Sequence, residues 1–182
     1  MTEVFVLRLS HRKDRDKRVT THCALVARAF LAKKIYYTGD KDEKFEKKVM
    51  DVARRWGGPF EIEYVKDWKK LIKNFDGIKV HLTMYGTPLN KKIDEIKQAN
   101  KILVIIGSEK VPGIAYELAD YNISITTQPH SEIAALAIFL DRVFEGKEFD
   151  HEFSNAKVKI IPQEKGKKVI SLSQQPRKKS TQ

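Results

Sequence analysis

Short apolar runs recur along the chain and are separated by polar segments and glycines. Residues 102–106 form a continuous Ile-Leu-Val-Ile-Ile run, which is too short for a buried helix and rich in β-branched residues. Such a run is typical of a strand that is covered on both faces. Similar runs predict further strands at 3–9, 35–37, 60–64, 78–84 and 121–126. The run at 60–64 alternates with glutamates and is expected at a sheet edge.

Apolar residues at helical spacing lie between these runs. They predict helices over 20–31, 45–56, 68–75, 89–96, 113–119 and 133–143. Thr20 or Thr21 is expected to cap the first helix, Asp67 is expected to cap the third, and Pro129 is placed to start the last. The repeated order of strand and helix predicts an α/β fold, with a mostly parallel sheet and helices on both faces.

The sequence becomes more polar after Gly146. Two basic, β-rich segments flank a Gln-Glu-Lys-Gly turn within residues 147–172, which predicts a β-hairpin extension. An RNA-facing flap and a plain dimer or edge-strand role remain open for this hairpin. Residues 173–182 are basic and are expected to form a disordered tail. The expected organisation is one domain over residues 1–146, followed by the hairpin and the tail.

Charge changes the picture more than overall composition does. The 182 residues include 35 Lys and Arg against 24 Asp and Glu, a formal net charge of +11. An excess of this kind favours a polyanionic partner, because cations that neutralise phosphates release counterions. RNA is the leading candidate, ahead of DNA or an anionic membrane surface. From charge alone, a basic surface that merely keeps the protein soluble fits equally well.

Several chemistries are disfavoured by absent motifs. Cys23 is the single cysteine, so neither an internal disulfide nor a cysteine-based zinc site can form, and a reducing cytoplasm is expected. No apolar run resembles a signal core or is long enough to cross a bilayer, so no membrane association is expected. The chain has no phosphate-binding loop of ATPases, no dinucleotide-binding glycine motif and no common zinc motif. We therefore expect no metal.

Polar loops follow the predicted strands at the positions where α/β proteins bind ligands. A glycine-bounded loop covers 107–113, and a second polar corner covers 127–132. The carboxyl ends of parallel strands expose backbone N–H groups beside helix N-termini, which favours a small-molecule site. The first predicted strand leads into a basic loop over residues 8–18. Such a run is normally a solvated surface, but arginines at the edge that carries the ligand favour phosphate contact.

These loops also carry a resemblance. The segments I-G-S-E-K-V-P, Y-E-L-A-D-Y-N and Q-P-H-S-E-I-A-A-L-A-I-F-L-D-R resemble the knotted carboxyl half of the SPOUT class of S-adenosylmethionine-dependent RNA methyltransferases. More narrowly, they resemble the archaeal tRNA (cytidine(56)-2′-O)-methyltransferases, and residues 8–22 resemble the first motif of that family. The resemblance implies a C-terminal trefoil knot, a homodimer, a tRNA substrate and S-adenosyl-L-methionine as the cofactor.

The resemblance also implies roles for individual residues. The cofactor-binding residues are expected to be Leu82, Tyr85, Gly86, Gly107, Ser108, Glu109, Lys110, Val111, Ile125, Thr126, Thr127, Gln128, Pro129, His130, Ser131 and Glu132. Arg12, Arg15 and Arg18 are the catalytic candidates, with His130 and Ser131 as orienting candidates. RNA contacts are expected from Arg8, His11, Lys13 and Lys17. Because the first motif departs from the N-x-x-R pattern of related enzymes, the acting arginine stays open. The competing hypothesis is a basic RNA-binding module without catalysis.

Overall fold

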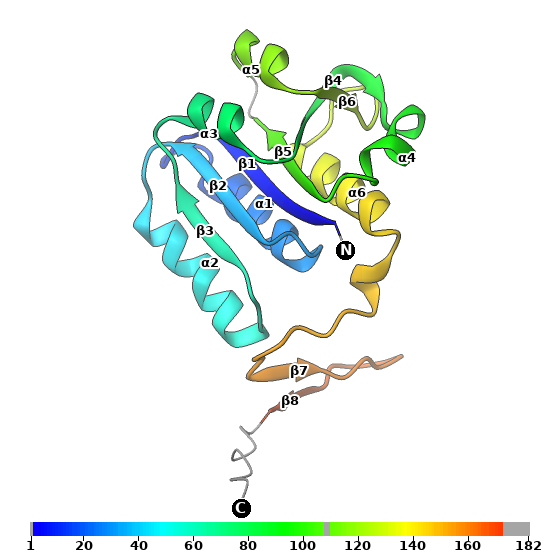
Figure 1. The fold of residues 1–182 in the computed structure, drawn as a ribbon. Helices are drawn as coiled ribbons and strands as arrows, with labels where there is room; N and C mark the ends of the chain where they lie inside the picture. Colours follow the sequence, from blue (N-terminus) through cyan, green and yellow to red (C-terminus); the bar gives the residue numbers. More distant parts are fainter. Residues whose placement is uncertain (1, 108–109, 173–182) are drawn as a thin grey trace, which may run out of the picture.

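The computed structural model describes residues 2–107 and 110–172 and places a six-stranded sheet at the centre of the molecule (Figure 1). The strands are β1 (Glu3–His11), β2 (Lys34–Gly39), β3 (Glu61–Tyr64), β4 (Ile78–Pro88), β5 (Lys101–Ile106) and β6 (Tyr121–Ser124). Their order is β3-β2-β1-β5-β4-β6, and every neighbouring pair is parallel. The predicted parallel α/β sheet is therefore confirmed, and β3 lies at an edge as its alternating glutamates indicated.

Helices cover both faces of the sheet (Figure 1). One face packs against α1 (Lys17–Ala29), α2 (Glu43–Trp56) and α6 (Glu132–Phe144). The other packs against α3 (Trp68–Asn74) and α5 (Gly113–Leu118). The predicted helix over residues 89–96 is broken into a 3-10 turn, η1 (Leu89–Lys91), and the short helix α4 (Ile93–Ile96).

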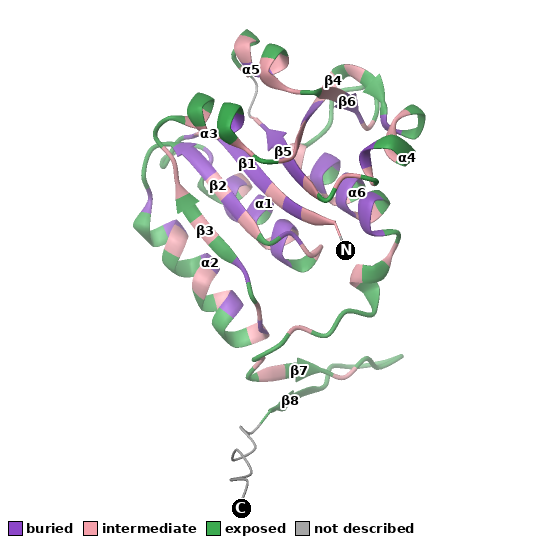
Figure 2. Cartoon of the chain, in the orientation of Figure 1, coloured by how far each residue is buried: buried purple, intermediate pink, exposed green. Residues whose placement is uncertain are grey.

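The two apolar layers follow from the alternation of side chains along the central strands. On β1, Val4 and Val6 face the layer of α1, α2 and α6, whereas Leu7 and Leu9 face the layer of α3 and α5. Successive side chains of a strand point to opposite faces, so a strand that is covered on both sides must be apolar throughout. In Figure 2 the buried residues are concentrated in the central strands. All of 102–106 is buried.

The first helix begins earlier than its sequence predicted. Asp16 is the residue before α1, and Thr20 and Thr21 lie buried within the helix and do not cap it. The hydroxyl of Thr21 instead donates to the carbonyl of Lys17 at 2.7 Å, and that of Thr20 contacts the His11 ring. The predicted start differs because a threonine that makes a buried side-chain contact has the same sequence signature as one that caps a helix.

The chain after α6 extends away from the sheet. It forms η2 (Lys147–Phe149) and then β7 (Val158–Ile160) and β8 (Val169–Ser171), which pair antiparallel. Two backbone hydrogen bonds, each of 2.9 Å, hold this extension to the end of α2. Lys157 N–H donates to the Arg55 carbonyl, and Gly58 N–H donates to the Ser154 carbonyl. The predicted tail, residues 173–182, lies outside the described residues. Among the residues described, no helix combines the length and apolar character needed to cross a membrane.

Candidate functional site

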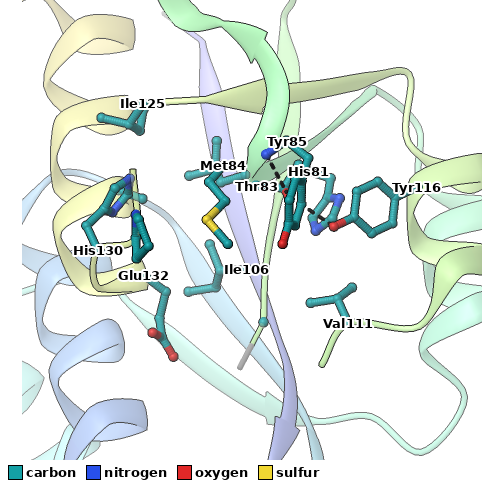
Figure 3. A pocket seen from close by; sticks show the side chains of 14 residues that line it. His81, Thr83, Met84, Tyr85, Ile106, Val111, Tyr116, Ile125, His130 and Glu132 are labelled. Atoms are coloured by element: carbon teal, nitrogen blue, oxygen red, sulfur yellow. Dashed lines mark hydrogen bonds between the residues drawn. The ribbon is translucent and has the colours of Figure 1, made fainter. Parts of the chain in front are cut away.

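A cleft lies at the carboxyl edge of the sheet, where β4, β5 and the chain after β6 meet the start of α6 (Figure 3). It encloses about 250 Å³. Its walls are formed by His81, Leu82, Thr83, Met84, Tyr85, Ile106, Gly107, Val111, Tyr116, Ile125, Pro129, His130, Glu132 and Ala135. This is the edge at which open parallel sheets bind ligands, because the loops diverge there. Three segments distant in sequence therefore contribute to one site.

Only part of the predicted cofactor set lines this cleft. The structure brings together Leu82, Tyr85, Gly107, Val111, Ile125, Pro129, His130 and Glu132. It leaves Gly86, Lys110, Thr126, Thr127, Gln128 and Ser131 outside the cleft wall. Ser108 and Glu109 lie outside the described residues. The prediction takes in whole loops, whereas the cleft is lined only by the residues on the inner side of each loop.

Local structure explains the residues that fall outside the wall. A Cβ on Gly86 would lie 2.5 Å from the backbone of Asn122 and Ile123, so this glycine permits the close approach of β4 and β6. Ser131 caps α6, and its hydroxyl accepts from Ile133 N–H at 3.1 Å. Thr126 accepts from Gln128 N–H at 3.0 Å and so closes its own turn. Each of these three residues thus has a structural role in the loop that carries it.

His81 is the most informative wall residue that the sequence pattern missed. It is fully buried, and its Nδ1 lies 2.9 Å from the side-chain oxygen of Asn122. The Asn122 amide nitrogen donates to the Tyr116 carbonyl at 3.0 Å, so its oxygen must accept from His81 Nδ1–H. Nε2 is thereby left as an acceptor, and no described residue donates to it.

Burial also fixes the charge of His81. Desolvation lowers the pKa of the imidazole, against a smaller opposing effect of the Asn122 hydrogen bond. The ring contacts Tyr116 edge to face, with centroids 4.6 Å apart, and the Tyr116 hydroxyl lies 3.0 Å from that of Thr83. A neutral imidazole with an unused acceptor therefore lies in the wall of the cleft, held by Asn122 and Tyr116. The alternation of β4 places His81 and Thr83 on one face, but nothing in the sequence signals Tyr116.

Arg8 supports the cleft from beneath. It is fully buried in the carboxyl half of β1. Its Nη2 lies 3.3 Å from Glu132 Oε1, and its Nη1 donates to the Leu9 carbonyl. The Glu132 side chain is 24% exposed and lines the cleft. The predicted RNA contact of Arg8 is wrong, because a side chain with no exposed surface cannot contact RNA. Its role here is to hold the carboxylate of Glu132.

His11 is likewise buried and does not contact RNA, which corrects a second prediction. Its Nδ1 lies 2.8 Å from the Thr20 hydroxyl and its Nε2 3.4 Å from the Asp42 carboxylate. Asp42 also caps α2 by accepting from Phe45 N–H at 3.0 Å. Burial raises the pKa of Asp42, but the hydrogen bonds from Phe45 and His11 outweigh it and leave the pKa lowered. His11 therefore ties the basic loop to α1 and α2.

The other cations of the basic loop are exposed and lie outside the cleft wall. They are Arg12, Lys13, Arg15, Lys17 and Arg18. Arg12 binds Asp16 in a bidentate pair at 2.8 and 3.1 Å, which lowers the pKa of that carboxyl group. The three arginines expected to be catalytic are therefore exposed on the surface of the chain. Among the described residues, no cluster of three His, Cys, Asp or Glu could hold a metal ion.

The chain matches a family model and several curated relatives. The model of the family described as "tRNA ribose 2′-O-methyltransferase, aTrm56" matches residues 56–170. A tRNA (cytidine(56)-2′-O)-methyltransferase of Archaeoglobus fulgidus is 62% identical over 93% of this chain and 99% of its own length. A protein of the same name from Pyrococcus horikoshii is 54% identical over 93% of this chain and 85% of its own length.

Solved structures extend the likeness to the fold. The TrmH/SpoU tRNA modifying enzyme of A. aeolicus matches with a TM-score of 0.60 and 18% identity, over 82% of this chain and 78% of that one. The SpoU methyltransferase AviRb of Streptomyces viridochromogenes, in complex with AdoMet, matches with a TM-score of 0.57 and 12% identity, over 80% of this chain and 58% of that one. From the family model and the curated relatives, this chain belongs to the tRNA ribose 2′-O-methyltransferase family, aTrm56.

Proposed function

We propose that this protein transfers a methyl group from S-adenosyl-L-methionine to the ribose 2′-hydroxyl of cytidine 56 of tRNA. The observation that carries the proposal is the cleft at the ends of β4 and β5 in a chain that is 62% identical to a tRNA (cytidine(56)-2′-O)-methyltransferase. The net charge of +11 fits a polyanionic RNA substrate. The target nucleotide follows from the relatives, since no feature of the cleft distinguishes one tRNA position from another.

The chemistry of the cleft fits the cofactor. Leu82, Val111 and Ile125 give it apolar walls, which exclude water from a bound nucleoside. His81 Nε2 is a buried acceptor that no described residue pairs, and we propose that the wall around the ring opens on binding, so that an amino or hydroxyl group of S-adenosyl-L-methionine donates to it. A Cβ on Gly107 would lie 2.3 Å from the Val111 side chain, so only glycine allows Val111 to pack this closely against the end of β5. When bound, the cofactor supplies an electrophilic methyl group.

The task of the protein is then to align the hydroxyl and to remove its proton. Alignment can be worth about 7–11 kcal/mol of the barrier, so no strongly basic group is required at the outset. Arg12, Arg15 and Arg18 are proposed to bind tRNA phosphate and to activate the hydroxyl, and the acting member stays open. Glu132, held by Arg8, presents a fixed carboxylate at the cleft, and the nearby His130 ring contacts the Ser131 carbonyl at 3.1 Å.

We also propose that the active form is a homodimer. The exposed arginines of the loop lie outside the cleft wall of their own subunit. A catalytic loop beside a cleft that it does not line supports a site that the loop of a second subunit completes. The trefoil knot of the carboxyl half, the division into a domain over 1–146 with a hairpin extension, and a cytoplasmic location belong to the same proposal.

Mass mapping of an unmodified archaeal tRNA transcript after incubation with the protein and S-adenosyl-L-methionine tests this function. The expected result is a single added methyl group on the ribose of cytidine 56, and none when the cofactor is omitted. A methyl group on a base, or no methyl group from a folded protein that binds the cofactor, would contradict the proposal.

A further inference from the structure

Most lysines on the sheet edges and around α4 are already neutralised. Lys34 contacts Glu61 at 3.0 Å and Glu63 at 2.6 Å, and Lys97 contacts Asp94 at 2.9 Å and Glu145 at 3.0 Å. The same holds for the pairs Lys33–Glu3, Lys79–Asp120, Lys92–Glu95 and Lys101–Asp76. The positive charge of these regions is largely cancelled locally, so the excess charge of the chain must lie elsewhere.

The outer face of α2 carries cations without such partners. Lys44, Lys47, Lys48 and Arg55 are exposed, and none of them makes an ion pair within the part of the chain that the structure describes. Asp51 lies beside these cations, but its carboxylate accepts a hydrogen bond from the Arg54 guanidinium at 2.7 Å. Spacings of three, four and seven residues place these side chains on one stripe of the helix. We call these four cations the α2 basic stripe.

The α2 basic stripe lines a depression of the protein surface. A shallow depression of about 420 Å³ is lined by Lys44, Lys47, Lys48, Asp51, Val52, Arg55 and Trp56. The Arg55 guanidinium lies 5.6 Å from the centroid of the half-buried Trp56 ring, which holds it in place by a cation–π contact. Cations around a hollow can contact a chain of phosphates from two sides, which isolated surface lysines cannot do.

The position of the stripe connects it to the basic loop. The first residue before α2, Asp42, contacts His11, and the backbone N–H of Lys13 donates to Asp40 at 3.0 Å. At the other end, the Arg55 carbonyl accepts from Lys157 of the extension (Figure 1). A helix of 14 residues spans about 21 Å. The stripe therefore leads from the loop that carries Arg12 to the extension that carries the exposed Lys167 and Lys168.

We propose that the α2 basic stripe is a second tRNA-binding surface, which holds the phosphate backbone of the substrate away from the reacting ribose. This proposal rests on the proposed function for the identity of the polyanion. Unpaired lysines and arginines gain most from phosphate contact, because they release counterions and break no existing ion pair. The half-buried Trp56 offers no protruding apolar group for membrane insertion, which favours RNA over a lipid surface.

The test compares two triple variants of the full-length protein. Lys44→Gln/Lys47→Gln/Lys48→Gln removes three charges from the stripe, and Lys33→Gln/Lys92→Gln/Lys97→Gln removes three from lysines that already contact carboxylates. The Kd for unmodified tRNA is measured by fluorescence anisotropy at several salt concentrations. We expect the stripe variant to bind about tenfold more weakly and to lose about 2 units of the slope of log K against log salt concentration. The control variant should change neither value appreciably.

Kinetics separate this surface from the cleft. At saturating tRNA, the stripe variant should methylate at the parental single-turnover rate, because the stripe does not touch the reacting group. Parental affinity and salt slope in the stripe variant, or an equal loss in both triple variants, would overturn the proposal. So would a stripe-dependent affinity for anionic vesicles that exceeds the affinity for tRNA. If the parental protein binds tRNA but does not methylate it, the proposed function fails and the binding data alone decide the role of the stripe.

Discussion

Arg8 Nη2 lies 3.3 Å from Glu132 Oε1, so the end of the first strand is joined to the first turn of the last helix across 124 residues of sequence. The guanidinium is fully buried, whereas the carboxylate reaches the cleft. Glu132 also lies at the N-terminus of α6, where the helix dipole favours a negative charge. The pair therefore fixes a carboxylate at the floor of the proposed cofactor site.

Removing the carboxylate should destabilise the protein. Glu132→Gln leaves the buried guanidinium without its charged partner, which typically costs about 3–5 kcal/mol; partial exposure of Glu132 places the expected loss near the lower limit. Urea unfolding measures it. The double variant Arg8→Met/Glu132→Gln should recover most of the loss, because no buried charge remains. Equal stability of the parental protein and the single variant would show that the pair contributes nothing.

His81 should contribute to cofactor affinity. His81→Phe keeps a ring of similar shape but removes both the acceptor at Nε2 and the Nδ1–H that donates to Asn122. One neutral hydrogen bond to the cofactor is worth about 0.5–1.5 kcal/mol. Calorimetric titration with S-adenosyl-L-methionine should show a Kd raised about three- to tenfold. The matched control is His22→Phe, on the exposed side of α1. If both variants bind the cofactor as the parental protein does, Nε2 does not face the ligand.

The same histidine should make stability depend on pH. Burial lowers the pKa of folded His81, so the unfolded chain takes up a proton first as pH falls through the ordinary value of about 6.5. The free energy of unfolding should therefore decrease between about pH 6.5 and pH 5. Parallel urea titrations of the parental protein and His81→Phe measure this, and the variant should show a shallower decrease. Identical slopes would contradict a buried neutral imidazole.

The exposed arginines should separate into binding and catalytic members. Replacing Arg12, Arg15 or Arg18 by Ala should cost about 1.5–3 kcal/mol, the value of a charge-assisted hydrogen bond. A phosphate contact should appear as weaker tRNA binding and be restored by Lys, whereas a residue that activates the hydroxyl should lower the single-turnover rate and resist that rescue. Cofactor affinity is the internal control and should not change. If all three Ala variants keep the parental rate and the parental tRNA affinity, the loop is an exposed charged segment with no role in binding or catalysis.

The reactivity of the buried Cys23 thiol reports how tightly α1 packs against the sheet. Desolvation raises the pKa of this buried thiol to about 12, so almost no thiolate exists at neutral pH. Labelling with a thiol reagent should therefore be very slow in the native protein and fast in denaturant. Rapid labelling of the native protein would show that the layer between α1 and the sheet opens readily.

Periodicity was sufficient for the main elements of the fold. The apolar run at 102–106 is β5, and Asp67 caps α3 by accepting from Lys70 N–H at 3.0 Å. Both signals are local, because strand burial and helix capping depend on neighbouring residues. Thr20 of α1 instead contacts His11 of β1, which in turn contacts Asp42, and local sequence could not reveal these contacts between elements.

The site was harder to predict than the fold. The converging loops were found because the strand ends of a parallel sheet are a topological position. Arg8 and His11 were read as surface cations, since charged residues are rarely fully buried, yet both have buried partners far away in sequence. Tyr116 enters the cleft from α5 without any pattern around it. Contacts between distant elements thus decide which residues of a loop line the cleft.

The most direct test of the central claim is methyl transfer to a tRNA that lacks one oxygen atom. Two transcripts are compared with radiolabelled S-adenosyl-L-methionine, one with cytidine at position 56 and one with 2′-deoxycytidine there. The deoxy transcript keeps the base, the phosphates and the fold of the tRNA, so it should bind but accept no label, whereas the ribose transcript should accept one methyl group. Equal labelling of the two transcripts would contradict 2′-O-methylation at this nucleotide.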